Sequence, residues 1–265
     1  MPNTTPSGAI RPCPEPASAP TWLRGKTIIV TGAGSGLGAA VAQVLGAEGA
    51  AIVLADIAFE RARERAALLA ERDVRTLALA LDVGDETQVR RVVAQTRERF
   101  GRIDALVNSA AIDNAVPLAE LLGADWERLL RANLSGPLLM AKHVAAAMAP
   151  KSAGGGQIVN IVSIASKRAG TNAAAYHATQ WGLLGLSHAL HAELRGQGIK
   201  VSAVVTGGML TPFAHDRIAD SDPAPPRNPQ NPLDVALTVR FVLNQPEETA
   251  IPELMVLTMR ERSWP

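Results

Sequence analysis

"TGAGSGLG", residues 31–38, lies between the apolar run "TIIV" at 27–30 and the alanine-rich stretch "AAVAQVLGAEG" at 39–49. The β-branched run predicts a buried strand that stops at the glycines, and the stretch after them predicts a helix closed by Gly49. Glycines at this junction let the backbone approach a pyrophosphate, and the helix N-terminus offers that anion unpaired N–H groups. The stretch therefore predicts a strand–turn–helix unit that binds a dinucleotide.

Short apolar runs and amphipathic stretches alternate along the rest of the chain. Strands are expected at 26–32, 51–56, 74–83, 102–110, 154–163, 199–208 and 252–259. Helices are expected at 36–49, 59–73, 85–101, 125–148, 173–196 and 234–244. Strands that are apolar almost throughout, each followed by a helix, indicate a parallel sheet covered on both faces. We expect an α/β fold, a single Rossmann-type, doubly wound parallel sheet of about seven strands flanked by helices.

Composition excludes several classes of protein. The chain has 265 residues, of which 47% are hydrophobic and 19% charged, as in globular proteins. The net charge of +1, without a basic stripe, argues against nucleic acid as a partner. No apolar run approaches the 18 residues of a spanning helix, so we expect no membrane segment. The single cysteine, Cys13, favours a reducing compartment, and we expect a cytoplasmic protein.

Proline marks two segments outside this alternation. Residues 1–21 are proline-rich and lack the apolar core of a secretory signal, so we expect a flexible tail there. Residues 22–265 show no second change of composition, which predicts one dinucleotide-binding domain. The segment from Thr211 to Pro232 contains six prolines, and a long loop of this kind is often functional. We expect the loop at about 206–232 to cover a substrate.

Asp56 ends the second expected strand. A carboxylate there can accept hydrogen bonds from both ribose hydroxyls of an adenosine and repels a 2′-phosphate. No arginine lies inside the glycine turn, and Ile57 follows the aspartate, so NAD(H) is favoured over NADP(H). Asp56 can also act as the N-cap of the following helix, and the two roles can coexist.

Together these motifs resemble the short-chain dehydrogenase/reductase family, from Leu23 to the C-terminus. The sequence departs from the family pattern in "NSAA", 108–111, which stands for Asn-Asn-Ala-Gly, and in Thr206, which stands for a proline. The resemblance implies cofactor contacts from the following residues: Gly32, Ser35, Gly36, Leu37, Gly38, Asp56, Asp82, Val83, Asn108, Ala110, Tyr176, Gln180, Gly207 and Thr211.

The same resemblance places three catalytic residues. Asn133 lies in the longest helical stretch, just before Gly136 and Pro137, where a kink is expected. Ser163 ends the fifth expected strand, and Tyr176 follows it after 13 residues. Tyrosine can move the proton of a carbinol, serine can hold the carbonyl oxygen, and asparagine can organise a water. Taken singly, the serine and the asparagine have a simpler interpretation as partners of nearby backbone groups.

Gln180 stands where the family has a lysine, and the resemblance includes it with the catalytic residues. In the family, the lysine donates to the nicotinamide ribose and lowers the tyrosine pKa by its charge. An amide can still donate to the ribose but brings no charge. If that charge shifted the pKa by two or three units, its loss would be worth about 3–4 kcal/mol, or roughly a hundred- to a thousandfold in rate.

Three interpretations follow from Gln180. The first is an NAD(H)-dependent oxidoreductase that interconverts a carbonyl and a secondary alcohol, with Tyr176 as acid and base and with slow chemistry or a compensating group such as Lys167 or Arg168. The second is an NAD(H)-binding scaffold or sensor without hydride transfer. The third is an engineered lysine-to-glutamine change at position 180. The presence of all three expected catalytic residues favours the first.

The expected partners are a small carbonyl or alcohol substrate and further copies of the chain. In similar proteins, helices like those beginning near Asp125 and Ala173 form a dimer interface, so a homodimer or homotetramer is expected. His188 and His191 share one helix but lack a third ligand, so no metal is expected. The substrate-facing stretches contain apolar and polar residues and indicate no single substrate.

Overall fold

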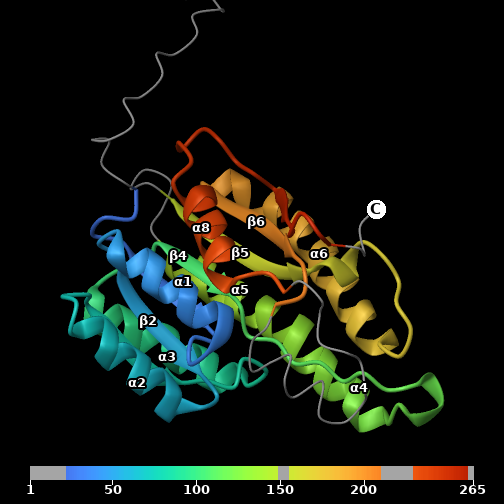
Figure 1. Ribbon diagram of the computed structural model, residues 1–265. Helices are drawn as coiled ribbons and strands as arrows, with labels where there is room; N and C mark the ends of the chain where they lie inside the picture. Colours follow the sequence, from blue (N-terminus) through green and yellow to red (C-terminus); the bar gives the residue numbers. More distant parts are fainter. Residues whose placement is uncertain (1–21, 149–154, 210–228, 262–265) are drawn as a thin grey trace, which may run out of the picture.

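Seven parallel strands form one sheet in the computed structural model, which describes residues 22–148, 155–209 and 229–261 (Figure 1). The expected tail, 1–21, lies outside the described residues, as do Thr211 and most of the loop at 206–232. The sheet order is β3-β2-β1-β4-β5-β6-β7. The strands are β1 (Thr27–Thr31), β2 (Ala51–Asp56), β3 (Thr76–Ala80), β4 (Ala105–Asn108), β5 (Gly156–Ser163), β6 (Ile199–Thr206) and β7 (Glu253–Val256).

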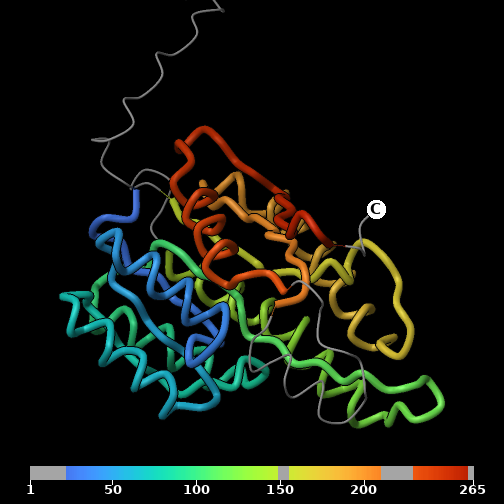
Figure 2. Tube along the Cα trace, in the orientation of Figure 1, coloured from blue at the N-terminus to red at the C-terminus, as the bar shows by residue number. Residues whose placement is uncertain are grey.

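Helices connect the strands and cover both faces of the sheet, as the backbone trace shows (Figure 2). The α-helices are α1 (Gly36–Ala47), α2 (Phe59–Ala70), α3 (Glu86–Phe100), α4 (Gly123–Leu130), α5 (Gly136–Ala147), α6 (Ala174–Leu194) and α8 (Pro232–Leu243). Short helical turns lie at Leu118–Glu120, Arg131–Ser135, Ile164–Ser166 and Arg195–Gln197. The expected doubly wound α/β fold is thereby confirmed.

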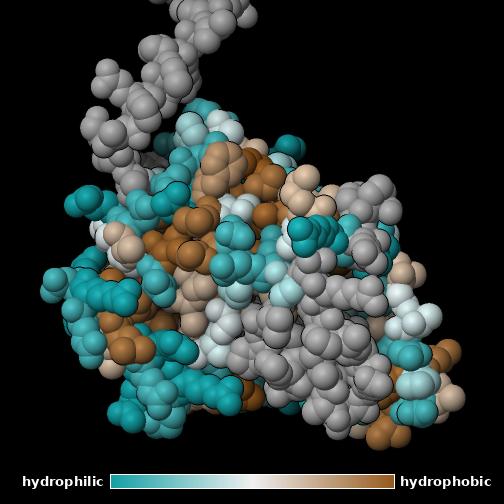
Figure 3. Space-filling model, viewed as in Figure 1, coloured by the Kyte–Doolittle hydropathy of each residue, from teal (hydrophilic) through white to brown (hydrophobic). Residues whose placement is uncertain are grey.

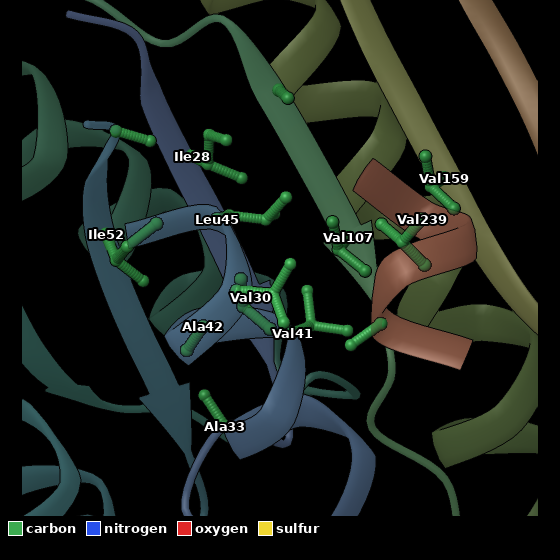
Figure 4. Close-up of a cluster of buried hydrophobic side chains, with 14 of the residues drawn as sticks. Ile28, Val30, Ala33, Val41, Ala42, Leu45, Ile52, Val107, Val159 and Val239 are labelled. Carbon is green, nitrogen blue, oxygen red and sulfur yellow. The ribbon is translucent and has the colours of Figure 1, made fainter. Parts of the chain in front are cut away.

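Two apolar cores lie on opposite faces of the sheet because side chains alternate along each strand. On β1, Ile28 and Val30 face the core beneath α1, α2 and α8 (Figure 4), whereas Ile29 faces the core beneath α3, α5 and α6. All three side chains have no solvent exposure. This two-sided burial explains why the strands lack the polar alternation of a half-exposed sheet.

The kink expected at Gly136 and Pro137 is a π turn, Arg131–Ser135, directly before α5. Proline is tolerated in the first turn of α5, where its missing N–H costs no helix bond. A Cβ on Gly136 would stand 2.6 Å from the Val83 side chain, so glycine allows α5 to pack closely there. The turn places Asn133 between α4 and α5.

The order of the strands reverses between β1 and β4, and this reversal positions the site. The chain runs outward from β1 to β3 and returns to pair β4 with the other side of β1. In open α/β sheets, ligands bind beyond the carboxyl ends of the strands at such a reversal. No helix of the described residues is long and apolar enough to cross a membrane.

Candidate functional site

The glycine turn follows β1 at the point where the strand order reverses. Gly32 has a φ of +66°, and a Cβ on it would stand 2.9 Å from the Ala110 Cα. A Cβ on Gly38 would overlap the carbonyl oxygen of Gly32. Ser35 is the N-cap of α1, but its hydroxyl accepts no hydrogen bond from the first turn. The turn therefore lacks side-chain bulk and leaves first-turn N–H groups of α1 for an anion.

The other residues of the turn take separate structural roles. Gly36 has a φ of +53°, a left-handed conformation that favours glycine. Leu37 points into the core beneath α1 and is 7% exposed, so its side chain anchors the helix.

Asp56 ends β2 with both carboxylate oxygens on backbone N–H groups. Oδ2 accepts from Gly34 and Oδ1 from Ala58, each at 2.8 Å. The aspartate thus holds the glycine turn and the start of α2 together. Arg61, in the first turn of α2, was missed by the sequence analysis. Its Cβ stands 3.0 Å from the place of a Cβ on Gly34, so this arginine lies beside the turn, although none lies within it.

Asp82 and Val83 follow β3 and face different neighbours. The Asp82 carboxylate accepts from the Gly84 N–H at 2.9 Å and from Arg131 Nη2 at 2.7 Å. Val83 is 8% exposed and lies in the core beneath α5. The ion pair with Arg131 joins this stretch to the π turn that carries Asn133.

The turn after β4 is held by Thr31, at the end of β1. Its hydroxyl oxygen accepts from the backbone N–H groups of Ser109 and Ala110, each at 3.1 Å. Thr31 is 1% exposed. The sequence shows that Thr31 precedes the glycine turn, but it does not show the contact of Thr31 with Ala110, 79 residues away.

A buried polar network crosses from β4 to α6. Asn108 Nδ2 donates to Asn160 Oδ1 at 2.9 Å, and Asn160 Nδ2 donates to Ser187 Oγ at 2.9 Å. Ser187 in turn donates to the Leu183 carbonyl. The sequence analysis missed Asn160, although one asparagine within the apolar run of β5 is a visible signal of a buried polar contact.

Asn133 is 1% exposed, and its amide is engaged at both ends. Oδ1 accepts from the Ile112 N–H at 2.8 Å, and Nδ2 donates to the Ile112 carbonyl at 2.8 Å. Nδ2 also lies 3.2 Å from Thr179 Oγ1, and Thr179 donates to the Tyr176 carbonyl at 2.8 Å. The Asn133 side chain thus fixes the stretch after β4 and links it to α6.

Ser163 ends β5 and meets α6 through Gln180. Its backbone N–H donates to Gln180 Oε1 at 2.8 Å. Its hydroxyl oxygen accepts from the Ala165 N–H at 3.1 Å and caps the turn Ile164–Ser166. Gln180 is 2% exposed. The structure therefore brings two of the predicted catalytic residues into direct contact.

Tyr176 lies one helical turn before Gln180 on α6 and is 9% exposed. It packs in a small apolar cluster with Leu129 and Ala165. His177 places Nδ1 2.8 Å from the Ala165 carbonyl, so this nitrogen carries the proton. The start of α6 is therefore anchored to the turn after Ser163.

Two residues considered for other roles are engaged with β7. Lys167 Nζ lies 2.6 Å from Glu253 Oε1, and His188 Nε2 lies 3.1 Å from Glu253 Oε2. In the described part of the chain, no three His, Cys, Asp or Glu side chains gather as potential metal ligands. After β6, the N–H of Gly207, one of the expected cofactor contacts, donates to Gln230 Oε1 at 3.1 Å.

Several known proteins are similar to this chain in architecture and in sequence. Residues 26–222 match the family model described as short chain dehydrogenase. The D-threitol dehydrogenase of Mycolicibacterium smegmatis is 39% identical over 193 residues, 73% of this chain and 74% of that protein. The crystal structure of levodione reductase matches with a TM-score of 0.82 and 29% identity, over 91% of this chain and 98% of that one. A metagenomic short-chain oxidoreductase in complex with NADP matches with a TM-score of 0.77 and 30% identity, over 90% and 99%.

Proposed function

Because the chain belongs to the short-chain dehydrogenase family, an oxidoreductase family, we propose that it interconverts a small carbonyl compound and a secondary alcohol with a nicotinamide cofactor. The observation that carries the proposal is the contact between Gln180 and Ser163, because it joins α6, which bears Tyr176, to the end of β5. Three separated predicted residues thus share the carboxyl edge of the sheet.

The residues of the glycine turn fit a dinucleotide. Glycines at 32 and 38 let the turn fold tightly, because a Cβ there would meet the backbone of Ala110 or of Gly32, and α1 begins with amides that Ser35 does not cap. A pyrophosphate would be held by these amides, and an adenosine ribose by Asp56. When bound, the nicotinamide supplies or accepts a hydride at the carbon of the substrate.

A side chain of the protein would transfer the proton that accompanies the hydride. In carbonyl reduction, the Tyr176 hydroxyl would donate its proton to the substrate oxygen, while the Ser163 hydroxyl holds that oxygen by a hydrogen bond. In alcohol oxidation, the same proton returns to the tyrosinate. Asn133 would hold the stretch after β4 in place and would not contact the substrate, because its amide is hydrogen-bonded to Ile112. Gln180 stands in place of the family's lysine and would donate to the cofactor ribose without adding charge.

We propose NAD(H) as the preferred cofactor. The Asp56 carboxylate retains lone pairs beyond those used by its two backbone partners, and its charge repels a 2′-phosphate. Arg61 opposes this preference, because its side chain starts beside the glycine turn. The NADP complex of the metagenomic oxidoreductase is a finding about that protein.

We also propose a homodimer or homotetramer. Trp126 on α4 and Trp181 on α6 are 37% and 53% exposed, and large aromatic residues are enriched at interfaces. On α8, Leu233, Leu237 and Phe241 are exposed at intervals of four residues, and apolar surface gathers around this helix (Figure 3). Size-exclusion chromatography with light scattering tests the proposal, and a monomer at micromolar concentration would contradict it.

Binding and turnover assays test the enzymatic function. NADH and NADPH binding is measured by fluorescence, and turnover is followed on a panel of ketones and alcohols that includes levodione and D-threitol. We expect tighter binding of NADH and turnover of at least one substrate. Tyr176→Phe should reduce kcat by about 10²- to 10⁴-fold while the dissociation constant of NADH stays within about threefold.

Other outcomes support the remaining interpretations. NADH binding without turnover, in both the wild type and Gln180→Lys, would favour a scaffold or sensor. Turnover in the lysine variant alone would mark Gln180 as the inactivating residue. Absence of nucleotide binding would exclude both the enzyme and the sensor.

A further inference from the structure

Gln180 makes a contact that lysine cannot make. Its Oε1 accepts the hydrogen bond of the Ser163 N–H at 2.8 Å, and the glutamine is 2% exposed. A lysine ammonium carries three donors and no acceptor. A lysine at this position would therefore leave the Ser163 N–H without the partner that it has here.

The strand pairing explains why Ser163 needs such a partner. β4 ends at Asn108, opposite Asn160, so β5 continues for three residues beyond its neighbour on that side. On the other side, β5 pairs with β6 as far as Ser163 and Thr206. Gln180 takes the place of the missing strand and holds the projecting end of β5 against α6.

Ser163 is thereby fixed at two points. Gln180 holds its backbone N–H, and the Ala165 N–H donates to its hydroxyl oxygen. Both contacts leave the hydroxyl hydrogen available to donate. In the proposed reaction, this hydrogen would meet the substrate oxygen, so its direction depends on the two anchors.

The other end of the Gln180 amide is a donor. Among the described residues, no acceptor binds Nε2 within hydrogen-bond distance, whereas Oε1 is engaged. Because one amide carries a donor and an acceptor, it can bind a cofactor hydroxyl and a backbone N–H at the same time. Compared with a lysine at position 180, glutamine lacks the positive charge but has an additional hydrogen-bond acceptor.

We propose that Gln180 is a positioning residue that orients Ser163 through its backbone N–H while its Nε2 binds the cofactor, so that lysine is not an improved replacement. The inference rests on the proposed oxidoreductase function. It makes Gln180 a working part of this site, since an acceptor at position 180 is what the end of β5 requires.

Three variants separate the acceptor from the donor. Gln180→Glu keeps an acceptor and loses the donor, Gln180→Lys keeps a donor and loses the acceptor, and Gln180→Met loses both. Each is measured for its unfolding midpoint, for hydrogen exchange of the Ser163 amide, for NADH affinity, and for kcat and KM with a carbonyl substrate at saturating NADH.

The lysine and glutamate variants should differ in opposite ways from the wild type in NADH affinity and in exchange of the Ser163 amide. Gln180→Lys should bind NADH within about threefold of the wild type, but lose about tenfold in kcat/KM for the carbonyl, unfold several degrees lower and exchange the Ser163 amide faster. Gln180→Glu should keep the slow exchange of the Ser163 amide but bind NADH about tenfold more weakly, and burial of its carboxylate should lower the unfolding midpoint. Gln180→Met should show both losses.

Two results would overturn the inference. One is a tenfold or greater gain of kcat/KM in Gln180→Lys with an unchanged unfolding midpoint, because lysine would then serve the reaction better than glutamine at no cost in stability. The other is equally fast exchange of the Ser163 amide in Gln180→Glu and Gln180→Met. If the wild type turns over no substrate, the proposed function fails, but hydrogen exchange and NADH binding still decide the role of Gln180.

Discussion

Asn133 holds Ile112 at both of its backbone polar groups, with 2.8 Å from Oδ1 to the N–H and 2.8 Å from Nδ2 to the carbonyl. One side chain in the π turn thus replaces the strand partner that the stretch after β4 lacks. Because Nδ2 also reaches Thr179, the same amide connects this stretch to the helix of Tyr176.

Replacing Asn133 by alanine should therefore loosen the stretch after β4. The lost hydrogen bonds leave buried polar groups, which costs about 1–3 kcal/mol of unfolding free energy. Turnover should fall together with stability, because the stretch lies next to the glycine turn. Thermal unfolding and steady-state kinetics measure both effects.

The matched control is Asn244→Ala. Asn244 accepts from the Trp22 N–H at 3.0 Å, at the amino edge of the sheet. This variant should lower stability and leave turnover within about twofold of the wild type, since one partly buried hydrogen bond is worth about 1 kcal/mol. Equal loss of turnover in both variants would show that stability alone is responsible.

Asp56→Asn should weaken the proposed preference for NADH. The change removes the charge that repels a 2′-phosphate, and repulsion of about 1–4 kcal/mol corresponds to roughly tenfold or more in NADPH affinity. Adding Arg61→Ala should reverse the gain, because the Arg61 side chain starts beside the turn and carries a positive charge. Fluorescence titration of both cofactors measures the effect, and an unchanged ratio of affinities in Asp56→Asn would contradict this role for the carboxylate.

Lys167→Met should leave kcat within about twofold of the wild type. Its ammonium group lies 2.6 Å from Glu253 Oε1, and this ion pair directs its charge toward β7. The pair is partly exposed, so its loss should cost about 0–1 kcal/mol of stability. A tenfold fall in kcat would instead identify Lys167 as a cation that takes part in the proposed reaction.

Glu86→Gln should remove an acid-sensitive contribution to stability. The hydrogen bond from Lys142, together with that from His143, lowers the pKa of Glu86 to about 2 from its usual 4.5. Because the folded pKa is depressed, the contribution is present above about pH 4.5 and is lost as the pH falls toward 2. Glu86→Gln should unfold at a lower temperature than the wild type at pH 7, and the difference should shrink as the pH falls from about 4.5 toward 2. A difference that is as large at pH 2 as at pH 7 would exclude ionisation as its cause.

Local rules were enough to predict the fold and the glycine turn. The apolar run of β1 and the glycines after it predict their own conformation, because backbone sterics act between neighbours. The sequence analysis also placed Asp56 correctly at the end of β2. It missed Arg61 as a neighbour of the turn, because α2 brings the arginine back beside Gly34 only after the chain has passed through β2.

Spacing located the candidate catalytic residues but could not orient them. Asn133 was expected in an interrupted helix, and the interruption is there as a π turn. Its partner Ile112, however, lies 21 residues away, across a loop whose path depends on β1 and β4. Their proposed roles in catalysis stay predictions until the variants are measured.

The sequence by itself determined the order of strands and helices, the glycine turn, and the absence of a positive charge at position 180. Only the tertiary structure decided where the Gln180 amide points. Its oxygen meets the Ser163 N–H because α6 packs against the end of β5, which projects beyond β4. Hydrophobic periodicity is local and readable along the chain, whereas the partner of a buried polar group depends on which segments the fold brings within about 3 Å of each other.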